Sequence, residues 1–473
     1  MKLSRRKLLA GGAALGVAAP AAKHLMWSQK DFTLPGYDPT APQATATGAS
    51  WINWSGSQKA TPTSINYPTG EAELQELIRT STGRARPVGS GHSFTGLARS
   101  SDMMIDLAAM DSLIGYDPAT GHATFGAGTK LFHAAAELNQ RGRAFANLPD
   151  IDVQTLAGSF ATGTHGTGNQ LTALHDYIEG FRLVTANGDV LDVSRNSDPD
   201  LFQAGKVSLG ALGIMTQFTV RTVPAFSLHR KLTIEPMAPF FDRIEALGEQ
   251  HRNFEFFYSP STQLVAWLSH DEYVGAPTER EDSQDDAFLL GLKQLRDSFG
   301  WFPWLRRKIA QASFPTGLIE DVKDESWALL STTRPHKFNE MEYHLPQEHG
   351  VATLRKIVTM LDRKKDVFFP LEYRHVAADD AWLSPFNGGP RSSIAIHAAA
   401  DEPYDYFFSE FEPVYRAVGG RPHWGKHHSL RREALSALYP AFETFLALRR
   451  DLDPSGKFLN RHLSDLFGES FNG

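Results

Sequence analysis

The feature that most constrains this chain is a run of small and hydroxylic residues from Thr155 to Gly168, TLAGSFATGTHGTG. Residues of this kind let a backbone approach a ligand closely, and their hydroxyl groups can donate hydrogen bonds to anionic oxygens. The run suits a hydrophobic core poorly. We therefore expect it to line a site for an extended ligand that carries a pyrophosphate and a polyol chain.

A second loop of this kind precedes it, RPVGSGHSF from Arg86 to Phe94. Its small residues allow successive backbone N–H groups to converge on an anion, as in phosphate-binding nests. The spacing does not match the dinucleotide fingerprint G-x-G-x-x-G, because Phe94 occupies the position of the last glycine. Taken alone, this loop could equally be an ordinary turn.

Together, GSGHS and AGSFATGTHGTG resemble the two FAD-contacting loops of the vanillyl-alcohol-oxidase family, which has the PCMH-type FAD-binding fold. A third element, SLGALGI from Ser208 to Ile214, is similar to the segment beside the adenine end of FAD in that family. The resemblance spans residues 52–226 and implies FAD as the cofactor. It assigns FAD contacts to Pro87, Val88, Gly89, Ser90, Gly91, His92, Ser93, Pro149, Asp150, Thr155, Gly158, Ser159, Thr162, Thr164, His165, Gly166 and Ile214.

The histidine of the first loop is where the sugar-oxidising members of that family attach the flavin covalently. The resemblance therefore implies that His92 carries FAD through a covalent bond, and a neutral imidazole nitrogen is a competent nucleophile. The alternative is a histidine that only packs against the cofactor. A second, cysteinyl link is excluded because the chain contains no cysteine.

A chain of 473 residues is too long for one ordinary core, so two domains are expected. Pattern and resemblance predict an α+β fold with a two-subdomain PCMH-type FAD-binding domain and a mixed-sheet substrate (cap) domain. The predicted divisions are a twin-arginine signal segment at 1–28, a linker at 29–50, the FAD-binding domain at 51–226 and the substrate domain at 227–473, whose segment 421–473 returns to the flavin. Periodicity predicts helices at 71–80, 130–141 and 351–363, and strands at 103–107, 181–185, 213–223, 254–258, 263–268 and 393–398.

The segment VFFPLEYRHV, residues 367–376, predicts a strand on which Glu372 and Arg374 share one face. A surface strand would leave both in solvent, so the pattern alone does not decide their role. The pair resembles the substrate-side pair of alditol and aldonolactone oxidases, in which the arginine steadies the reduced flavin and the glutamate orients the substrate hydroxyl. His397 likewise matches a histidine near the substrate in that family.

Near the C-terminus, GRPHWGKHH (residues 420–428) resembles the H-W-x-K motif of the aldonolactone oxidases. The resemblance places Lys426 beside the flavin N1 and C2 carbonyl, where negative charge accumulates on reduction. A Walker A motif is excluded because His427 stands where serine or threonine is required. The three histidines could bind a metal by number alone, but no carboxylate accompanies them at ligand spacing, and we expect no metal site.

The predicted reaction is hydride transfer from a CH–OH group of a sugar derivative to flavin N5, with an aldonolactone favoured and an alditol as the alternative. Pro149 lies at the position where, in resembling oxidases, glycine or proline accompanies reaction with oxygen. Oxygen is therefore the expected acceptor, and a dehydrogenase that uses a quinone or cytochrome is the rival enzyme. A flavin-bearing redox-storage protein is the non-enzymatic alternative.

The first residues, SRRKLL from Ser4 to Leu9 followed by a weakly apolar stretch, resemble a twin-arginine export signal. Export to the periplasm is therefore expected, and a basic tail is the alternative. A formal net charge of −7 gives no general attraction to nucleic acid. Aromatic residues in FGWFPWL, Phe299–Leu305, precede a basic cluster, so this segment is either a packed flap or a peripheral membrane contact.

Overall fold

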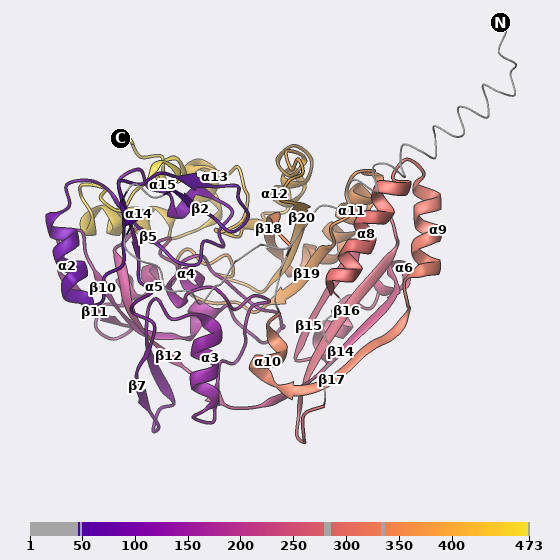
Figure 1. The fold of residues 1–473 in the computed structure, drawn as a ribbon, viewed down its shortest axis with the longest axis horizontal. Coiled ribbons are helices and arrows are strands. Elements are labelled where there is room, and N and C mark those ends of the chain that lie inside the picture. Colours follow the sequence, from indigo (N-terminus) through magenta and orange to yellow (C-terminus); the bar gives the residue numbers. More distant parts are fainter. Residues whose placement is uncertain (1–45, 48–49, 279–284, 333–335, 472–473) are drawn as a thin grey trace, which may run out of the picture.

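A computed structural model describes residues 46–47, 50–278, 285–332 and 336–471, which form two lobes joined at the centre of the molecule (Figure 1). The predicted signal segment and most of the predicted linker lie outside the described residues. Ala46 and Thr47, which fall in the predicted linker, pair with Ser64 and Ile65 as an edge strand.

The first lobe contains a four-stranded sheet, β1-β4-β6-β5, and a five-stranded sheet, β11-β10-β12-β8-β7. Its elements are β1 (Ala46–Thr47), β2 (Trp51–Ile52), β3 (Lys59–Ala60), β4 (Ser64–Asn66), α2 (Glu71–Thr80), β5 (Ala85–Val88), η1 (Gly96–Ala98), β6 (Met103–Asp106), β7 (Leu113–Asp117), β8 (His122–Gly126), α3 (Leu131–Asn139), β9 (Arg143–Ala144), α4 (Leu156–Ala161), η2 (Leu174–Tyr177), β10 (Ile178–Val184), β11 (Val190–Ser194), α5 (Pro199–Lys206), β12 (Ile214–Arg221) and β13 (Val223–Pro224). The predicted helix at 71–80 is confirmed, and it buries Leu74 and Ile78 one turn apart.

The second lobe is built on one eight-stranded sheet, β17-β14-β16-β15-β19-β20-β18-β21, whose strand pairs are all antiparallel, so the prediction of a mixed sheet is wrong. Its elements are β14 (Ser227–Pro236), α6 (Met237–Phe240), α7 (Ile244–Gln250), β15 (Asn253–Ser259), β16 (Leu264–Tyr273), α8 (Asp285–Phe299), α9 (Pro303–Ser313), β17 (Gly317–Glu325), α10 (Ser326–Leu330), β18 (Phe338–Pro346), η3 (Gln347–His349), α11 (Gly350–Arg363), β19 (Leu371–Val376), β20 (Arg391–Ala399), η4 (Phe407–Phe411), α12 (Glu412–Arg416) and β21 (Arg421–Pro422). The strands predicted at 254–258, 263–268 and 393–398 are confirmed within β15, β16 and β20.

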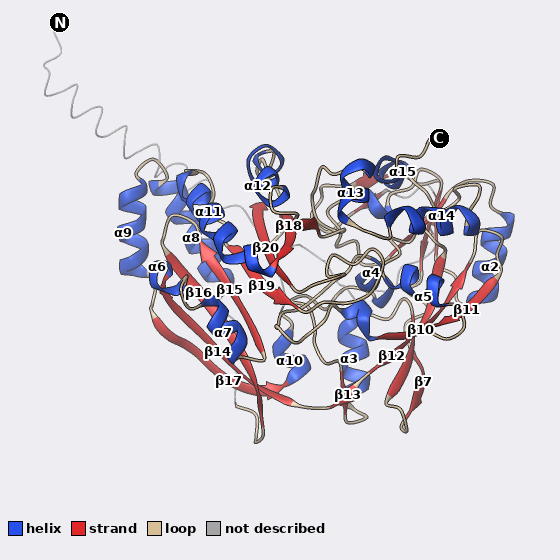
Figure 2. Ribbon diagram, turned by 180° about the vertical axis from the view of Figure 1, so that it is seen from behind, coloured by secondary structure: helices blue, strands red, loops and turns tan. Residues whose placement is uncertain are grey.

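The central strands of this sheet have one apolar and one polar face. Met341, Tyr373 and Ile394 lie on the apolar face, in the same core as Leu354 and Ile357 of α11, and α11 and α7 lie over the sheet in Figure 2. The alternate residues of β18, β19 and β20 turn toward the first lobe. Because side chains alternate along a strand, one register gives both a core face and a polar site.

The C-terminal helices α13 (Arg432–Leu438), α14 (Phe442–Leu452) and α15 (Arg461–Phe467) return to the first lobe (Figure 1). The N–H of Ala85 donates to the carbonyl of Lys457 at 2.8 Å, beside the start of β5. The side chain of Asn460 donates to the carbonyls of Gly96 and Arg99, both at 2.8 Å. The chain end thus braces the loop that follows β5.

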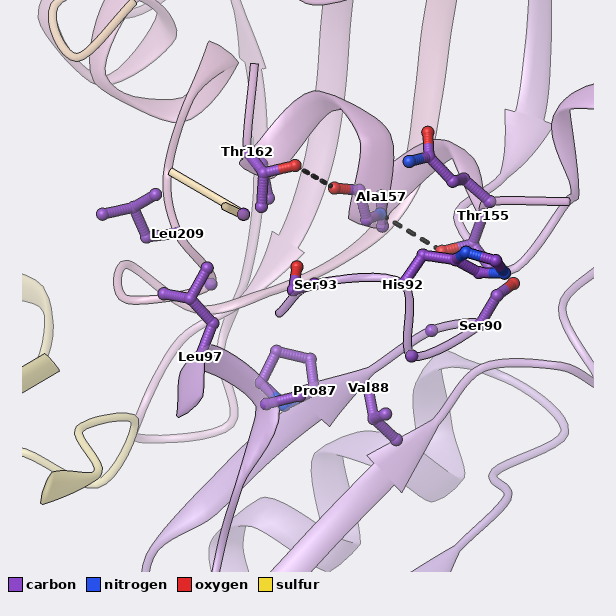
Figure 3. Close-up of a pocket in the computed structure, with 18 of the residues that line it drawn as sticks. Pro87, Val88, Ser90, His92, Ser93, Leu97, Thr155, Ala157, Thr162 and Leu209 are labelled. Carbon is purple, nitrogen blue, oxygen red and sulfur yellow. Dashed lines mark hydrogen bonds between the residues drawn. The ribbon is translucent and has the colours of Figure 1, made fainter. Parts of the chain in front are cut away.

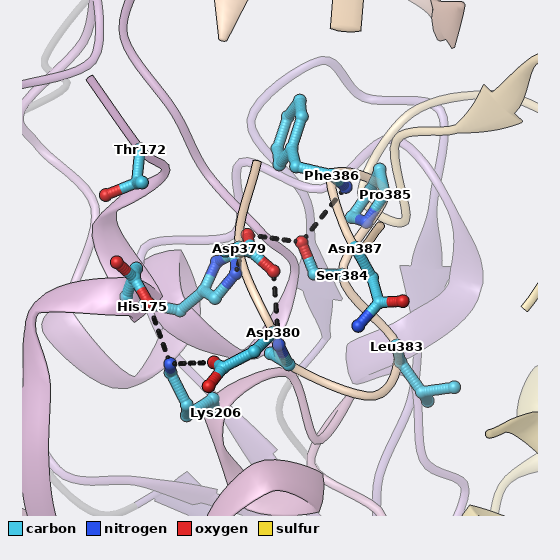
Figure 4. Close-up of polar contacts among 12 residues, drawn as sticks. Thr172, His175, Lys206, Asp379, Asp380, Leu383, Ser384, Pro385, Phe386 and Asn387 are labelled. Carbon is cyan, nitrogen blue, oxygen red and sulfur yellow. Dashed lines mark hydrogen bonds and ion pairs between the residues drawn. The ribbon is translucent and has the colours of Figure 1, made fainter. Parts of the chain in front are cut away.

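A buried polar network also joins the lobes (Figure 4). His175 Nε2 lies 2.8 Å from Asp379 Oδ2, and both side chains are fully buried. The Lys206 ammonium bridges Asp176 at 2.8 Å and Asp380 at 2.9 Å. Since Asp379 and Asp380 belong to the loop between β19 and β20, this network fixes the substrate lobe against α5 and η2.

The packed-flap expectation for Phe299–Leu305 is wrong for its aromatic side chains. Trp301, Phe302 and Trp304 are exposed, although Arg306 and Ala310 of the same hairpin are buried. The hairpin packs through one side of α9, so the other side of its tip faces solvent.

Candidate functional site

A cavity of about 1380 Å³, including space open to solvent, lies between the loops of the first lobe and the C-terminal segment. Figure 3 shows His92, Ser90 and Thr155 close together in this cavity, with Leu97 and Leu209 further along it. The predicted site residues that line it are Pro87, Val88, Gly89, Ser90, Gly91, His92, Ser93, Thr155, Gly158, Thr162 and Lys426.

The first loop presents its backbone to the cavity as an array of donors. Within the described residues, the N–H groups of Gly89 through Ser93 donate to no protein acceptor. Gly91 has a φ of +71°, which glycine adopts without strain. A Cβ on Gly89 would lie 2.4 Å from Thr155 Oγ1. These features fit a site that receives phosphate oxygens.

His92 is a half-buried residue at one end of the cavity, with its Nε2 atom buried. Its ring stacks on Trp54 with centroids 5.1 Å apart, and its Nε2 has no hydrogen-bond partner. Burial lowers the pKa of His92 to about 3, and the nearby charges of Lys426 and Lys130 act in the same direction. The imidazole is therefore neutral and keeps a nitrogen lone pair for bond formation.

The second loop packs helix α4 against the cavity. Thr155 caps this helix by accepting a hydrogen bond from the Gly158 N–H at 3.2 Å. Ser159 turns away from the cavity and donates to the Leu156 carbonyl at 2.9 Å. One side of α4 therefore forms part of the cavity wall, whereas the side chain of Ser159 bonds within the helix.

The third segment approaches the cavity through its backbone. Leu209 and Gly210 adopt left-handed φ values of 55° and 63°, and both line the cavity. The buried Arg86 guanidinium donates to the carbonyls of Leu209 and Gly210 at 2.8 and 2.6 Å and thereby holds this turn against β5. Ile214 is buried in the core, while its neighbour Gly213 reaches the cavity wall.

Several predicted residues lie behind the cavity wall. Those that do not line the main cavity are Pro149, Asp150, Ser159, Thr164, His165, Gly166, Ile214, Glu372, Arg374 and His397. Asp150, Gly166 and Arg374 line a second, polar cavity of about 230 Å³. Pro149 is buried, and its carbonyl accepts a hydrogen bond from Ser331 Oγ at 2.7 Å.

Glu340 connects the cavity to the predicted catalytic residues, and the sequence analysis missed it. Its carboxylate contacts Lys426 Nζ, and His397 Nε2 lies 3.6 Å from its other oxygen. The side chains of Glu340, Glu372 and His397 bring three polar atoms within 4.8 Å of one another. Burial opposes ionisation of Glu340, but Lys426 and His397 outweigh it and lower the pKa to about 2.

Arg374 lies between two carboxyl groups, those of Glu372 and Glu255. It contacts Glu372 directly, and its Nε lies 2.7 Å from Glu255 Oε2. Burial raises the pKa of Glu372 well above its usual value, with Asp150, Glu255 and Glu340 adding to the effect and Arg374 opposing it. The carboxyl groups of Glu372, Glu255, Glu340 and Asp150 outnumber the two cations of the site, Arg374 and Lys426. We therefore take the Glu372 carboxyl to be protonated and the Arg374 guanidinium to be charged.

A second buried cluster joins the lobes beside this site. His165 Nδ1 lies 2.8 Å from the Gly166 carbonyl, to which it must donate, and Nε2 lies 3.0 Å from Glu342 Oε1. The Gly425 N–H donates to His423 Nδ1 at 3.0 Å, so the proton of neutral His423 resides on Nε2. His165, Glu342 and His423 have a spacing that could hold a metal ion. His165 Nε2 and Glu342 Oε1 already bond to each other, and His423 Nδ1 accepts from Gly425. In the neighbouring cluster, Lys426 contacts Glu340 and Arg374 contacts Glu372, so positive charge is already supplied there.

Residues 87–93 fit FAD on three observations of this structure. The unpartnered N–H groups suit its pyrophosphate, the close approach of Gly89 to Thr155 leaves room only for backbone, and His92, which lines the cavity, has an Nε2 without a hydrogen-bond partner. Only the alternation of Glu340 and Glu342 with apolar Met341 and Tyr343 could have identified the missed carboxylates. That alternation is equally typical of a solvent-exposed strand.

Comparison with known proteins agrees with this site. A sequence profile for an FAD binding domain matches residues 62–194, and one for D-arabinono-1,4-lactone oxidase matches residues 218–466. The L-gulono-1,4-lactone dehydrogenase of Mycobacterium tuberculosis is 34% identical over 88% of this chain and 99% of its own length. The L-gulonolactone oxidase of Bos taurus is 28% identical over 89% and 98% of the two chains, and the alditol oxidase of a Streptomyces species is 28% identical over 88% and 98%.

The architecture also matches solved structures. A cholesterol oxidase from B. sterolicum superposes with a TM-score of 0.75 over 92% of this chain and 99% of its own, at 16% identity. That likeness shows the fold alone, and it confirms the predicted PCMH-type FAD-binding domain with a cap. The predicted family and FAD as cofactor are confirmed as well. The chain belongs to the D-arabinono-1,4-lactone oxidase family of FAD-dependent oxidoreductases.

Proposed function

We propose that the protein oxidises a CH–OH group of an aldonolactone. The observation that carries this proposal is the buried cluster of Glu340, Glu372, Arg374, His397 and Lys426 at the end of the FAD cavity next to His92. The names of the relatives from Mycobacterium tuberculosis and Bos taurus support a lactone substrate.

Bound FAD supplies the acceptor for the electron pair of the carbinol C–H bond. His397 donates from Nδ1 to the Pro370 carbonyl at 2.8 Å, and its Nε2 lies 3.6 Å from Glu340 Oε1, so these two side chains together are placed to accept the hydroxyl proton. The protonated Glu372 carboxyl orients the substrate oxygen by hydrogen bonding. Lys426 and Arg374 place positive charge where negative charge develops during oxidation.

The test is anaerobic reduction of the bound flavin by a panel of aldono-1,4-lactones and alditols. We expect lactones to bleach the flavin absorbance in the wild type and far more slowly in Glu372→Ala, which removes the hydrogen-bonding carboxyl. Alditols as the better reductants would favour the second candidate, an alditol oxidase, which the Streptomyces relative supports. If no member of the panel reduces the flavin, the chain acts as a redox-storage protein and the proposal fails.

The second part of the proposal is that FAD is bound covalently through His92. The unpartnered Nε2 and the lowered pKa of His92 support this assignment, because the imidazole is both neutral and unengaged. Acid denaturation of the purified protein tests it directly. Yellow flavin that stays with the precipitated chain supports the covalent bond, and flavin that is released into the supernatant excludes it.

The third part concerns the electron acceptor, for which we propose oxygen. Pro149 supports this choice through the family pattern at its position, whereas the dehydrogenase name of one relative favours a different acceptor. Reoxidation of the reduced enzyme in air, measured by stopped flow, separates the two.

We also propose export to the periplasm by the twin-arginine route, on the strength of Arg5 and Arg6 in SRRKLL. Replacing both with lysine preserves charge but removes the paired guanidinium groups. Fractionation of cells that express the Arg5→Lys/Arg6→Lys variant should show the protein retained in the cytoplasm. Normal periplasmic accumulation of that variant would contradict the proposal.

A further inference from the structure

The tip of the α8–α9 hairpin exposes three aromatic side chains, which we call the aromatic tip. Trp301, Phe302 and Trp304 expose 77, 52 and 67% of their surface. Figure 1 shows α8 and α9 side by side at the end of the molecule remote from β7 and from the first lobe. Large apolar groups gathered on one protruding turn of a folded protein mark a contact surface.

Contacts with the rest of the substrate lobe fix the base of the aromatic tip. The buried Arg306 guanidinium donates to the Val367 carbonyl at 2.9 Å, and Arg296 contacts Glu402 at 2.6 Å. The N–H of Gly300 donates to the Arg296 carbonyl at 2.7 Å, and a Cβ on Gly300 would lie 2.9 Å from the Lys365 carbonyl. The fold therefore presents the aromatic side chains outward on a fixed base.

Positive charge surrounds the aromatic tip. Residues 300–313 include three basic side chains and no acidic one, although the whole chain carries a formal charge of −7. Lys308 is exposed on α9, and exposed Lys365 places its ammonium 5.5 Å from the ring centroid of Trp301. Exposed Asp366 follows the basic run 363–365, and Lys364 of that run pairs with Glu410 at 2.8 Å.

The area and shape of the tip favour a lipid surface over a protein. A fully buried aromatic side chain covers about 150–250 Å², so three offer at most roughly 750 Å², below the ~800 Å² per partner of a standard protein interface. A convex tip of tryptophan and phenylalanine flanked by lysine suits the headgroup region of a bilayer, where aromatic rings and cations are both stabilised. Among the described helices, none is long and apolar enough to cross a membrane, so the contact would be peripheral.

We propose that the aromatic tip docks the protein on an anionic phospholipid surface. Trp301, Phe302 and Trp304 enter the headgroup region to a depth of about 5–10 Å. Lys308 and Lys365 then contact lipid phosphates beside them. This contact is independent of the oxidation chemistry, because the tip lies outside the FAD cavity and its polar cluster.

The experiment is co-sedimentation of the flavin-loaded protein with vesicles of phosphatidylcholine alone or mixed equally with phosphatidylglycerol. We compare the wild type with Trp301→Ser/Trp304→Ser and with Lys308→Ala/Lys365→Ala. The control is Ile114→Ser, which removes an apolar side chain of 52% exposure on β7, in the other lobe. Every variant keeps residues 1–45, so any contribution of that segment is constant.

We expect the wild type to sediment with the anionic vesicles, and Ile114→Ser to match it. The double tryptophan variant should lose roughly tenfold or more in affinity, and the double lysine variant roughly fivefold per lysine together with most of its salt dependence. Flavin content and lactone turnover should be unchanged in both. The proposal is overturned if the wild type stays in the supernatant with both vesicles, if the tryptophan variant binds equally well, or if light scattering shows that the tip instead joins two copies of the chain.

Discussion

His165 Nε2 lies 3.0 Å from Glu342 Oε1, and this contact joins the second FAD loop to strand β18 of the substrate lobe. Both side chains are buried, so each depends on the other for a hydrogen bond that water would otherwise make. The pair thus links the position of the second FAD loop to the position of β18, the strand that also carries Glu340.

We expect Glu342→Gln to lower the free energy of unfolding by about 3 kcal/mol, because removal of one charge strands its buried partner. The matched control is Glu443→Gln, whose partner Arg432 is exposed, and it should cost under about 1 kcal/mol. Urea unfolding followed by tryptophan fluorescence measures both. Equal losses in the two variants would show that burial adds nothing to the His165 contact.

The same carboxylate predicts a pH dependence. Burial disfavours its charge, but the contact with His165 outweighs burial and holds the pKa of Glu342 well below its usual value. A depressed pKa contributes stability that is complete above the unfolded value, about 4.3, and is lost as pH falls through the folded value. The wild type should therefore lose more stability than Glu342→Gln between pH 6 and pH 3, and a parallel decline would contradict the assignment.

How far the fold was predictable from the sequence depended on local signals. Helix 71–80 was predicted to the residue, because Leu74 and Ile78 repeat at helical spacing. The contacts of His175 and Lys206 with Asp379 and Asp380 could not be predicted from the sequence. The partners lie far apart in the chain, and only the tertiary fold brings them together. For Trp301 the sequence left a packed flap and a peripheral membrane contact both open, and only the structure shows that its side chain is exposed.

For the site, the loops were predictable and their partners were not. The glycine pattern around Gly89 has few structural explanations other than close approach of a ligand. Glu340, in contrast, alternates with apolar neighbours as any half-exposed strand would, and only the pairing of β18 with β20 places it opposite His397. Sequence periodicity gives the face of a residue but not the strand beside it.

Gly89→Ala should sharply reduce FAD content. The new Cβ would lie 2.4 Å from Thr155 Oγ1, the atom that caps α4, so the loop or the cap must move. Gly115→Ala is the control, because a Cβ there meets nothing within 4 Å. The ratio of flavin to protein absorbance after purification measures loading, and equal ratios in the two variants would exclude a tight fit at Gly89.

His92→Ala should abolish covalent flavin attachment and leave the fold intact, because the loop geometry depends on glycine rather than on the imidazole. His270→Ala removes another buried imidazole with unpartnered nitrogens, but this one does not line the main cavity. Flavin fluorescence on a denaturing gel should vanish in the first variant and persist in the second. Fluorescence that still migrates with His92→Ala would show that the flavin is attached to another residue.

Glu340→Gln should slow flavin reduction by lactone roughly 10²-fold, the size expected when one preorganised charge is removed from a site. Lys426 would lose its carboxylate partner, and His397 its neighbouring negative charge. Because the pKa of Glu340 is about 2, this carboxylate is ionised throughout the working range and should add no inflection to the wild-type profile above pH 4. Single-turnover reduction across pH, with exposed Glu348→Gln as control, tests both statements.

The last prediction concerns Pro149 and the acceptor. Its neighbours Leu148 and Asp150 line the small polar cavity beside Arg374, while Ile151 lines the main cavity, so this segment forms the wall between the two. The Pro149 carbonyl is fixed by Ser331, and its ring holds φ near a single value, so the wall has a defined shape. If proline leaves a path for oxygen, the reduced wild type should reoxidise in air faster than free reduced flavin.

Pro149→Ala should slow that step without changing the rate of flavin reduction by lactone, because the substitution leaves Glu372 and His397 in place. Stopped-flow mixing of the anaerobically reduced protein with oxygen gives the reoxidation rate, and the exposed Pro440→Ala variant controls for loss of a proline. A wild type that reacts no faster than free flavin would favour a quinone or cytochrome as acceptor. A variant that reoxidises like the wild type would show that Pro149 shapes the wall but does not control the access of oxygen.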